Sequence, residues 1–291
     1  MAGGSAASMV ISASPRARRS ERGLCPACVR ELFDRAGRRY LYPLVCCDDC
    51  RPPAAEAPST VLCEDCGRES REPDVRRSGS VATGCAACGP ALRWEAVTGA
   101  DALAAAVAAI AAGGVAGVHD LFADQVVCDA RSDQALARMD GASGPVRVLV
   151  RNVSMAREVA NLSAPDIRAL VERVEPATLV RLREPVLPRA VRRATPDVDL
   201  FLPRTPLQYL LTARLDGPLA VWDRSGERAD EWPCDGTLTV SGLARAGRQS
   251  WTTALPARLT LGGTSSAQTA TRPFVRQEPA ASPAPSPIGT P

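Results

Sequence analysis

Apolar residues recur at strand or helix spacing between about residues 100 and 240, and this pattern predicts a mixed α/β domain. The Ala-rich run 101–114 predicts a helix, because Asp101 lies near its start and a Gly pair follows its last apolar residue. Short apolar runs predict strands at 115–118, 125–129, 146–150, 178–182, 218–222 and 237–240. Amphipathic runs predict helices at 132–139, 154–162, 164–174 and 205–215. Strands mixed with amphipathic helices over about 150 residues indicate a twisted sheet covered by helices.

The two ends of the chain lack this periodicity. Residues 1–23 are mostly Ala, Ser, Gly and Arg and predict a disordered arm, and the Pro/Ser/Ala-rich residues 264–291 predict a disordered tail. The arm has no apolar segment of the kind found in secretory signals, and no uninterrupted apolar run reaches about 18 residues. We therefore expect no membrane association and a cytoplasmic location.

Two absences from the composition exclude whole classes of chemistry. All 35 basic residues are Arg, so a lysine Schiff base and a P-loop lysine are excluded. His119 is the one histidine, which excludes a His-rich metal centre. The net charge of +3 is too small to indicate an electrostatic nucleic-acid binder. The arm offers four arginines without interleaved aromatics, so a solvated arm is favoured over RNA binding: Arg16, Arg18, Arg19 and Arg22.

Nine of the eleven cysteines lie between residues 25 and 88, and eight of them form an internal repeat. Each unit contains two C-x2-C pairs with 18 residues between the inner cysteines. The units are offset by 38 positions, and the offset also superposes the pair Arg38-Arg39 on Arg76-Arg77. The repeat predicts two modules, which we place at 24–51 and 62–92. The ligand candidates are Cys25, Cys28, Cys47 and Cys50 in the first module and Cys63, Cys66, Cys85 and Cys88 in the second.

Two C-x2-C pairs at this spacing are typical of a four-thiolate tetrahedral Zn²⁺ site. All four positions are filled, so we expect two structural zinc ions, which replace the hydrophobic core that so short a module cannot build. Each zinc–thiolate cluster carries a formal charge of about −2, and the two arginine pairs are candidates to offset it. The alternatives are a disulfide framework, which needs an oxidising compartment, and redox C-x2-C pairs. The repeated spacing favours zinc over both.

Three cysteines fall outside this set. Cys46 adjoins Cys47 but does not reproduce the 18-residue interval, so we treat it as a spare thiol. Cys128 lies in an apolar strand and is interpreted as a core residue. Cys234 is isolated in a loop, and its surroundings in the sequence indicate no function.

The stretch CPACVRELFDRAGRRYLYPLVCCDDC (25–50), followed by a second pair of C-x2-C turns ending in CAACGPAL, resembles the twin zinc fingers of HypF-type carbamoyltransferases. These are hydrogenase-maturation factors. In that family the fingers precede a YrdC-like domain, and GGVAGVHDLFADQVVCDA (113–130) resembles the start of that domain. The segments LPRTPLQYLL (202–211) and PLAVWDRSGE (218–227) resemble two later family motifs. The expected fold is therefore α/β (α+β), with two four-cysteine modules followed by a YrdC-like twisted-sheet domain at 98–245.

The resemblance implies a chemistry in which carbamoyl phosphate and ATP yield a carbamoyl-adenylate in the YrdC-like domain. It makes Thr205 and Ser225 the candidate cofactor-binding residues. Where the family has lysines and a Lys-Arg pair, this chain has His119, Met139-Asp140 and Gly144. Replacing cations by neutral or acidic residues weakens polyphosphate binding, so ATP is a doubtful ligand. The nearest compensating arginines are Arg138 and Arg147.

Two functions follow from these observations, and no catalytic residue is assigned for either. The first is a HypF-like component of carbamoyl transfer in [NiFe]-hydrogenase maturation, truncated relative to the family and with a degraded adenylate pocket. Its partner would be a hydrogenase-maturation protein or a full-length carbamoyltransferase. The second is an inactive, zinc-stapled scaffold or a module that binds RNA or a protein partner. His119 stands where the family has a lysine, and two interpretations are open: a functional residue, or the favoured one, a partly exposed histidine at the end of a strand, beside Asp120 and without a role.

Overall fold

The fold is described from a computed structural model of the chain. It describes residues 23–47, 50, 61–72, 76–77, 84–120, 124–140, 146–172, 177–184, 186–192, 197–224 and 232–241. The predicted arm, except Gly23, and the predicted tail lie outside these residues. No helix in the described part combines the length and the apolar character that a bilayer crossing requires.

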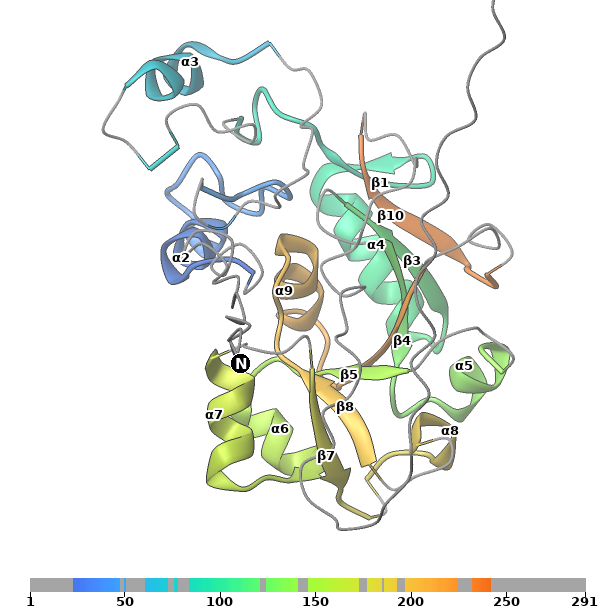
Figure 1. Ribbon diagram of the computed structural model, residues 1–291. Helices are drawn as coiled ribbons and strands as arrows, with labels where there is room; N and C mark the ends of the chain where they lie inside the picture. Colours follow the sequence, from blue (N-terminus) through green and yellow to red (C-terminus); the bar gives the residue numbers. More distant parts are fainter. Residues whose placement is uncertain are drawn as a thin grey trace, which may run out of the picture. The chain divides into compact units, whose positions relative to one another are not determined.

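Ten strands in the described residues form one sheet in the order β2-β1-β10-β3-β4-β9-β5-β8-β7-β6 (Figure 1). Two neighbouring pairs are parallel, β10 with β3 and β5 with β8, and the other pairs are antiparallel. The strands are β1 (Leu92–Trp94), β2 (Val97–Thr98), β3 (Val115–His119), β4 (Asp124–Asp129), β5 (Arg147–Leu149), β6 (Ala160–Asn161), β7 (Thr178–Leu182), β8 (Asp197–Phe201), β9 (Leu219–Asp223) and β10 (Gly236–Val240).

Helices cover both faces of this sheet. On one face, α4 packs against β1, β3, β4 and β10, and α9 packs against α4. On the other face, α5 and α8 contact one another, and α7 packs on β7 beside α6. The helices of the sheet domain are α4 (Gly99–Ala111), α5 (Asp133–Arg138), α6 (Val153–Val159), α7 (Ala164–Glu172), α8 (Arg189–Arg192) and α9 (Pro206–Thr212).

The alternation of side chains along the strands divides the core into two apolar clusters. On β4, Val127 belongs to the cluster under α4 and α9, whereas Val126 and Cys128 belong to the cluster under α5 to α8. The first cluster continues into the cysteine-rich segment through Leu32 and Tyr42. That segment and the sheet therefore share one core.

The cysteine-rich segment contains two short helices, α2 (Pro26–Phe33) and α3 (Glu64–Arg71). Each begins directly after the first cysteine of a C-x2-C pair, at Cys25 and at Cys63. Pro26 is the first residue of α2, where a helix does not need the missing N–H. In each module the second cysteine of the pair therefore lies one helical turn after the first.

The sequence predicts most of these elements with the correct type. The Ala-rich helix ends at Ala111, just before the predicted Gly pair, in which Gly113 has a φ of +82°. The helix predicted at 154–162 is too long, because the chain leaves it after Val159 to form β6. Strand β8 was not predicted, since Asp197 and Asp199 interrupt its apolar run. Strands β1 and β2 are too short to give a pattern.

The close packing of Trp94 on Gly236 gives a test of this sheet. A Cβ added to Gly236 would lie 2.6 Å from the indole ring of Trp94. Gly236→Ala should therefore displace the indole and lower the free energy of unfolding by about 1–3 kcal/mol, measured by urea denaturation. Gly67→Ala is the control, because its Cβ would meet only the guanidinium end of Arg71, at 3.5 Å. Equal destabilisation by both changes would contradict this account.

Candidate metal centres and polar cluster

Four cysteines of the first module converge on one point. Cys25 and Cys28 lie at the start of α2, and a turn in which the Cys50 N–H donates to the Cys47 carbonyl supplies the other two. The sulfur–sulfur distances are 3.9 Å for Cys25–Cys47, 3.6 Å for Cys47–Cys50 and 3.6 Å for Cys28–Cys50. We call this cluster site 1.

The second module repeats the arrangement. Cys63 and Cys66 lie at the start of α3, and the Cys88 N–H donates to the Cys85 carbonyl. The sulfur–sulfur distances are 3.9 Å for Cys63–Cys85 and 3.8 Å for Cys85–Cys88. We call this cluster site 2.

Both clusters have the dimensions of a zinc site. A tetrahedron with metal–sulfur distances of about 2.3 Å has edges of about 3.8 Å, which matches the sulfur–sulfur distances in both. All four sulfurs of each cluster lie within 4.8 Å of one another. All eleven cysteines are free in the structure, and the sulfurs within each module lie at the separations of a tetrahedral site rather than at the length of an S–S bond. The structure brings together all eight predicted ligands, and their chemistry fits two structural zinc ions.

The remaining cysteines lie away from the two clusters. Cys46 is buried, and its carbonyl accepts a hydrogen bond from Arg77. Cys128 is buried on β4, where burial raises the pKa of its thiol to about 12. Cys234 is half-buried against the same apolar cluster.

Arginines of the second module reach the sulfurs of site 1. Arg76 Nη1 lies 3.3 Å from Cys28 Sγ and 3.5 Å from Cys25 Sγ, and Arg77 Nη2 lies 3.7 Å from Cys28 Sγ. Arginines were predicted to offset the negative clusters. The structure shows that, at site 1, they come from the other module.

Two glutamates at the junction hold these arginines. Glu31 of α2 pairs with Arg39, Arg76 and Arg77 at 2.6–2.9 Å, and Glu69 of α3 pairs with Arg39 at 2.6 Å and with Arg38. Burial opposes ionisation of Glu31, but hydrogen bonds and charges from Arg39 and Arg77 outweigh it and hold the pKa of the carboxyl below its usual value. The junction between the modules is therefore ionic.

The second candidate region is a buried chain of hydrogen bonds in the sheet domain. Thr205 caps α9 by accepting from the Gln208 N–H, and Gln208 Oε1 accepts from the backbone N–H groups of Thr205 and Arg204. Gln208 Nε2 donates to Gln125 Oε1 at 2.9 Å, and Gln125 Nε2 donates to Asp223 at 3.0 Å. Thr205 is therefore tied to the sheet through a helix cap.

This chain ends on Arg147. Its guanidinium lies 2.5 Å from the Asp223 carboxylate and 5.2 Å from the centre of the Phe201 ring, and the residue is 3% exposed. Of this polar cluster, Thr205 and Arg147 were considered from the sequence. Gln125 and Asp223 were missed, although a polar residue within an apolar strand was a usable signal.

The other sequence candidates are dispersed. His119 is buried at the end of β3 with Nδ1 3.5 Å from the Asp124 carboxylate, so the expectation of a partly exposed side chain is wrong. Arg138 is only nine positions before Arg147 in the sequence, but it pairs with Asp235 at 2.7 Å instead of joining the polar cluster around Arg147. Ser225 lies outside the described residues.

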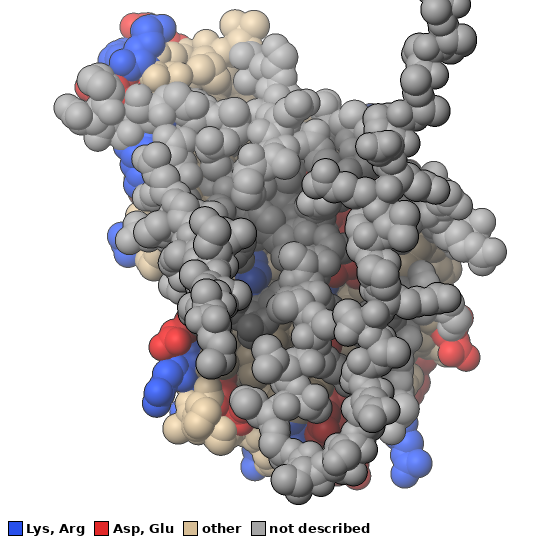
Figure 2. All heavy atoms as spheres, viewed as in Figure 1, with Lys and Arg blue, Asp and Glu red and all other residues tan. Residues whose placement is uncertain are grey.

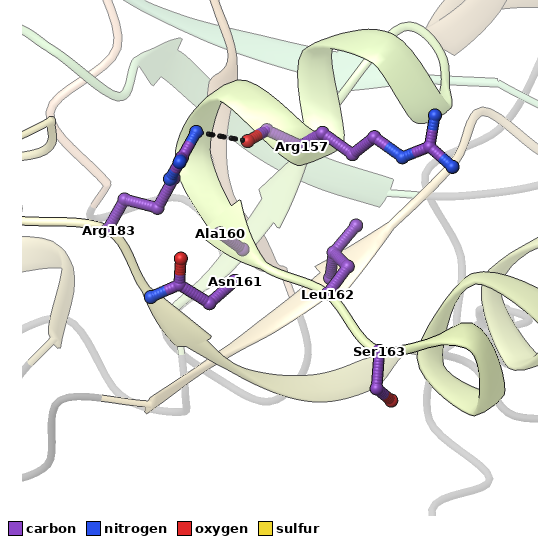
Figure 3. A pocket seen from close by; sticks show the side chains of 6 residues that line it. All are labelled: Arg157, Ala160, Asn161, Leu162, Ser163 and Arg183. Atoms are coloured by element: carbon purple, nitrogen blue, oxygen red, sulfur yellow. Dashed lines mark hydrogen bonds between the residues drawn. The ribbon is translucent and has the colours of Figure 1, made fainter.

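Among the described residues, one pocket lies apart from the predicted site residues. A pocket of about 570 Å³ at β6 is lined by Arg157, Ala160, Asn161, Leu162, Ser163 and Arg183. In Figure 3 the Arg183 guanidinium points to the Arg157 carbonyl, with a donor–acceptor distance of 3.0 Å, and the Arg157 guanidinium points away. Basic and acidic side chains lie intermixed over α3 in Figure 2, where Arg68 pairs with Glu64 and Asp65.

Comparison with known proteins identifies the plan of the chain. The HypF finger family model matches residues 24–55 and again residues 62–95. A carbamoyltransferase HypF of Rhodobacter capsulatus is 30% identical over 217 residues, covering 68% of this chain and 29% of that protein. The two modules are HypF fingers, and the chain is similar to HypF carbamoyltransferases over two thirds of its length. A carbamoyltransferase HypF2 of Cupriavidus necator is 29% identical over 211 residues, covering 65% of this chain and 26% of that protein. The chain therefore spans less than a third of the length of the curated relatives it matches.

Solved structures agree on the fold. A full-length HypF in a phosphate- and nucleotide-bound form has a TM-score of 0.64 and 24% identity, covering 76% of this chain and 33% of that one. A HypF from T. kodakarensis has a TM-score of 0.66 and 23% identity, covering 75% and 33%. The predicted fold class, two four-cysteine modules followed by a twisted-sheet α/β domain of the HypF plan, is confirmed.

The assignment of Cys47 rather than Cys46 as a ligand can be tested by zinc content. Cys47→Ser removes a thiolate from site 1, so the purified variant should hold at most one zinc ion. Cys46→Ser should keep two, because the Cys46 sulfur lies outside the cluster. Inductively coupled plasma mass spectrometry counts the metal. The reverse result in the two variants would show that the ligand choice is wrong.

Proposed function

We propose that this HypF-type chain takes part in carbamoyl transfer for [NiFe]-hydrogenase maturation, with the sheet domain as the nucleotide-handling part. The observation that carries the proposal is the order of the parts. Two HypF fingers precede a sheet domain, and the match to a carbamoyltransferase HypF runs over 217 residues. From the same similarity, the partner we propose is a full-length carbamoyltransferase or another hydrogenase-maturation protein.

The residue we assign to nucleotide binding is Arg147. The solved HypF with bound phosphate and nucleotide has the same fold, and phosphates bind most strongly to charge-assisted donors. In a chain without lysine, a guanidinium has to provide this charge. Arg147 is buried, stacks over Phe201 and is oriented by Asp223, which leaves its planar fork in a fixed position. Thr205 is a helix cap that positions the segment between β8 and α9.

The ion pair between Arg147 and Asp223 also supports a second candidate function. A buried cation that already has a carboxylate partner offers little net charge to a polyphosphate. The side-chain amides of Gln125 and Gln208 are likewise hydrogen-bonded to one another and to neighbouring groups. These contacts favour a zinc-braced scaffold that keeps the fold without adenylation and docks on a complete partner.

One assay separates the two functions. Zinc-replete protein is tested for exchange of pyrophosphate into ATP that depends on carbamoyl phosphate, with a full-length HypF as positive control. Adenylation predicts exchange above the background without carbamoyl phosphate. If exchange is absent and calorimetry detects no ATP binding, adenylation is wrong and the scaffold remains.

If exchange occurs, Arg147→Ala should lower its rate at least about tenfold, because it removes a charge-assisted contact to phosphate. Arg138→Ala is the matched control, since Arg138 pairs with Asp235 at a separate surface position and should leave the rate unchanged. Zinc content and circular dichroism check that both variants fold. Equal rates in the two variants would remove Arg147 from the proposed site.

A further inference from the structure

We propose that the arginine pair of each finger is part of the other finger's metal site, so that the two zinc ions bind cooperatively. The two pairs are Arg38-Arg39 in finger 1 and Arg76-Arg77 in finger 2. This inference concerns the fingers alone and does not depend on the proposed carbamoyl chemistry.

The first support is a pair of equivalent contacts that cross between the fingers. Arg39 Nε donates to the Gly84 carbonyl at 2.9 Å, and Gly84 directly precedes Cys85. Arg77 Nε donates to the Cys46 carbonyl at 2.8 Å, and Cys46 directly precedes Cys47. Each arginine therefore fixes the backbone before the third ligand of the opposite site.

The second support is the position of these arginines in their own fingers. Arg76 and Arg77 lie in the segment between Cys66 and Cys85, whose ends are both held by site 2. Their guanidinium groups reach the sulfurs of Cys25 and Cys28 at site 1. Outer-shell donors to thiolates stabilise the charged cluster, so the affinity of site 1 depends on the metal that organises site 2.

The third support is the balance of buried charge. Arg39 and Arg77 are each 2% exposed, and both contact Glu31 and Glu69. The four arginines carry a formal charge of +4. The two glutamates carry −2 and the two zinc–thiolate clusters about −4, so the arginines offset most of the negative charge. Arg77 reaches a sulfur of site 1 and Arg39 reaches the backbone before Cys85 of site 2, so both buried cations depend on the two organised clusters for partners. A buried cation without its partners is strongly unfavourable, which disfavours the one-zinc form.

Tyr42 adds a packing contact across the same junction. Its hydroxyl lies where a Cβ on Gly84 or Gly89 would be, so the loop of finger 2 that carries Cys85 and Cys88 closes around a finger 1 side chain. When site 2 is empty, this loop has no metal to hold its shape. Finger 1 then loses a packing surface as well as its ionic partners.

The test is the distribution of zinc species at partial loading. The full chain is stripped of metal, titrated with zinc and measured by native mass spectrometry. Two equal, independent sites give about half of the protein with one zinc at half-saturation. A coupling of about a hundredfold lowers this fraction to about one tenth. A one-zinc fraction near one half in the unmodified protein would overturn the proposal.

Two variants show whether the arginines carry the coupling. Arg77→Ala should raise the one-zinc fraction at half-saturation several-fold. Arg68→Ala is the matched control in the same finger, because Arg68 is exposed and pairs only with acidic residues of its own helix in the described contacts. An Arg77→Ala distribution identical to that of the unmodified chain would assign the coupling to packing and overturn the role of the arginine.

A ligand variant tests the same coupling without touching an arginine. Cys63→Ser disables site 2, and the remaining affinity of site 1 is measured with Co²⁺, whose absorption reports tetrahedral four-thiolate coordination. Site 1 should bind Co²⁺ at least about tenfold more weakly than in the unmodified chain. The absorption spectrum at saturating Co²⁺ shows that the site can still form. An unchanged affinity at site 1 would overturn the proposal.

Discussion

The structure of the first part of the chain depends on the need to balance two clusters of four thiolates. Each cluster with zinc carries a formal charge of about −2, and a segment this short has too few apolar residues to form a core of its own. The chain meets both needs at one junction. Arg39 and Arg77 are buried there between Glu31 and Glu69, so the cations that balance the clusters also hold the two fingers together. The same arginines therefore offset the charge of the clusters and fix the packing of the two fingers.

The same fingers are joined to the sheet domain by specific contacts. The Leu24 N–H donates to the Arg204 carbonyl at 2.9 Å, and Gly23 adopts a φ of +85° directly against Arg204. From Arg204, buried hydrogen bonds run through Gln208 and Gln125 toward Arg147. Because these hydrogen bonds are continuous from Leu24 to Asp223, the start of finger 1 is linked to the segment that leads into α9. The fingers thus brace the domain at the segment that carries the candidate residue Thr205.

The metal ligands could be predicted from the sequence, whereas their surroundings could not. Ligand spacing is a local property, since Cys25 and Cys28 occupy one turn whatever surrounds them. The crossed contact of Arg77 with the Cys46 carbonyl depends on how two modules pack, and no local pattern encodes that choice. The repeat had already aligned the arginine pairs at an offset of 38, but it could not say that each pair serves the opposite module. Strand β8 escaped prediction for a related reason, because its Asp199 is accommodated only by tertiary packing.

The use of arginine throughout the chain connects these two regions. A guanidinium stays charged when buried and presents a rigid fork, so it suits fixed junctions better than a mobile phosphate clamp. In the fingers, the rigid fork of Arg39 donates to one carboxylate of each module, Glu31 and Glu69. At Arg147 the same rigidity works against exchange, because Asp223 holds the fork in place until a ligand with more negative charge competes for it. Nucleotide binding by Arg147 therefore depends on the strength of one ion pair, the contact between its guanidinium and Asp223.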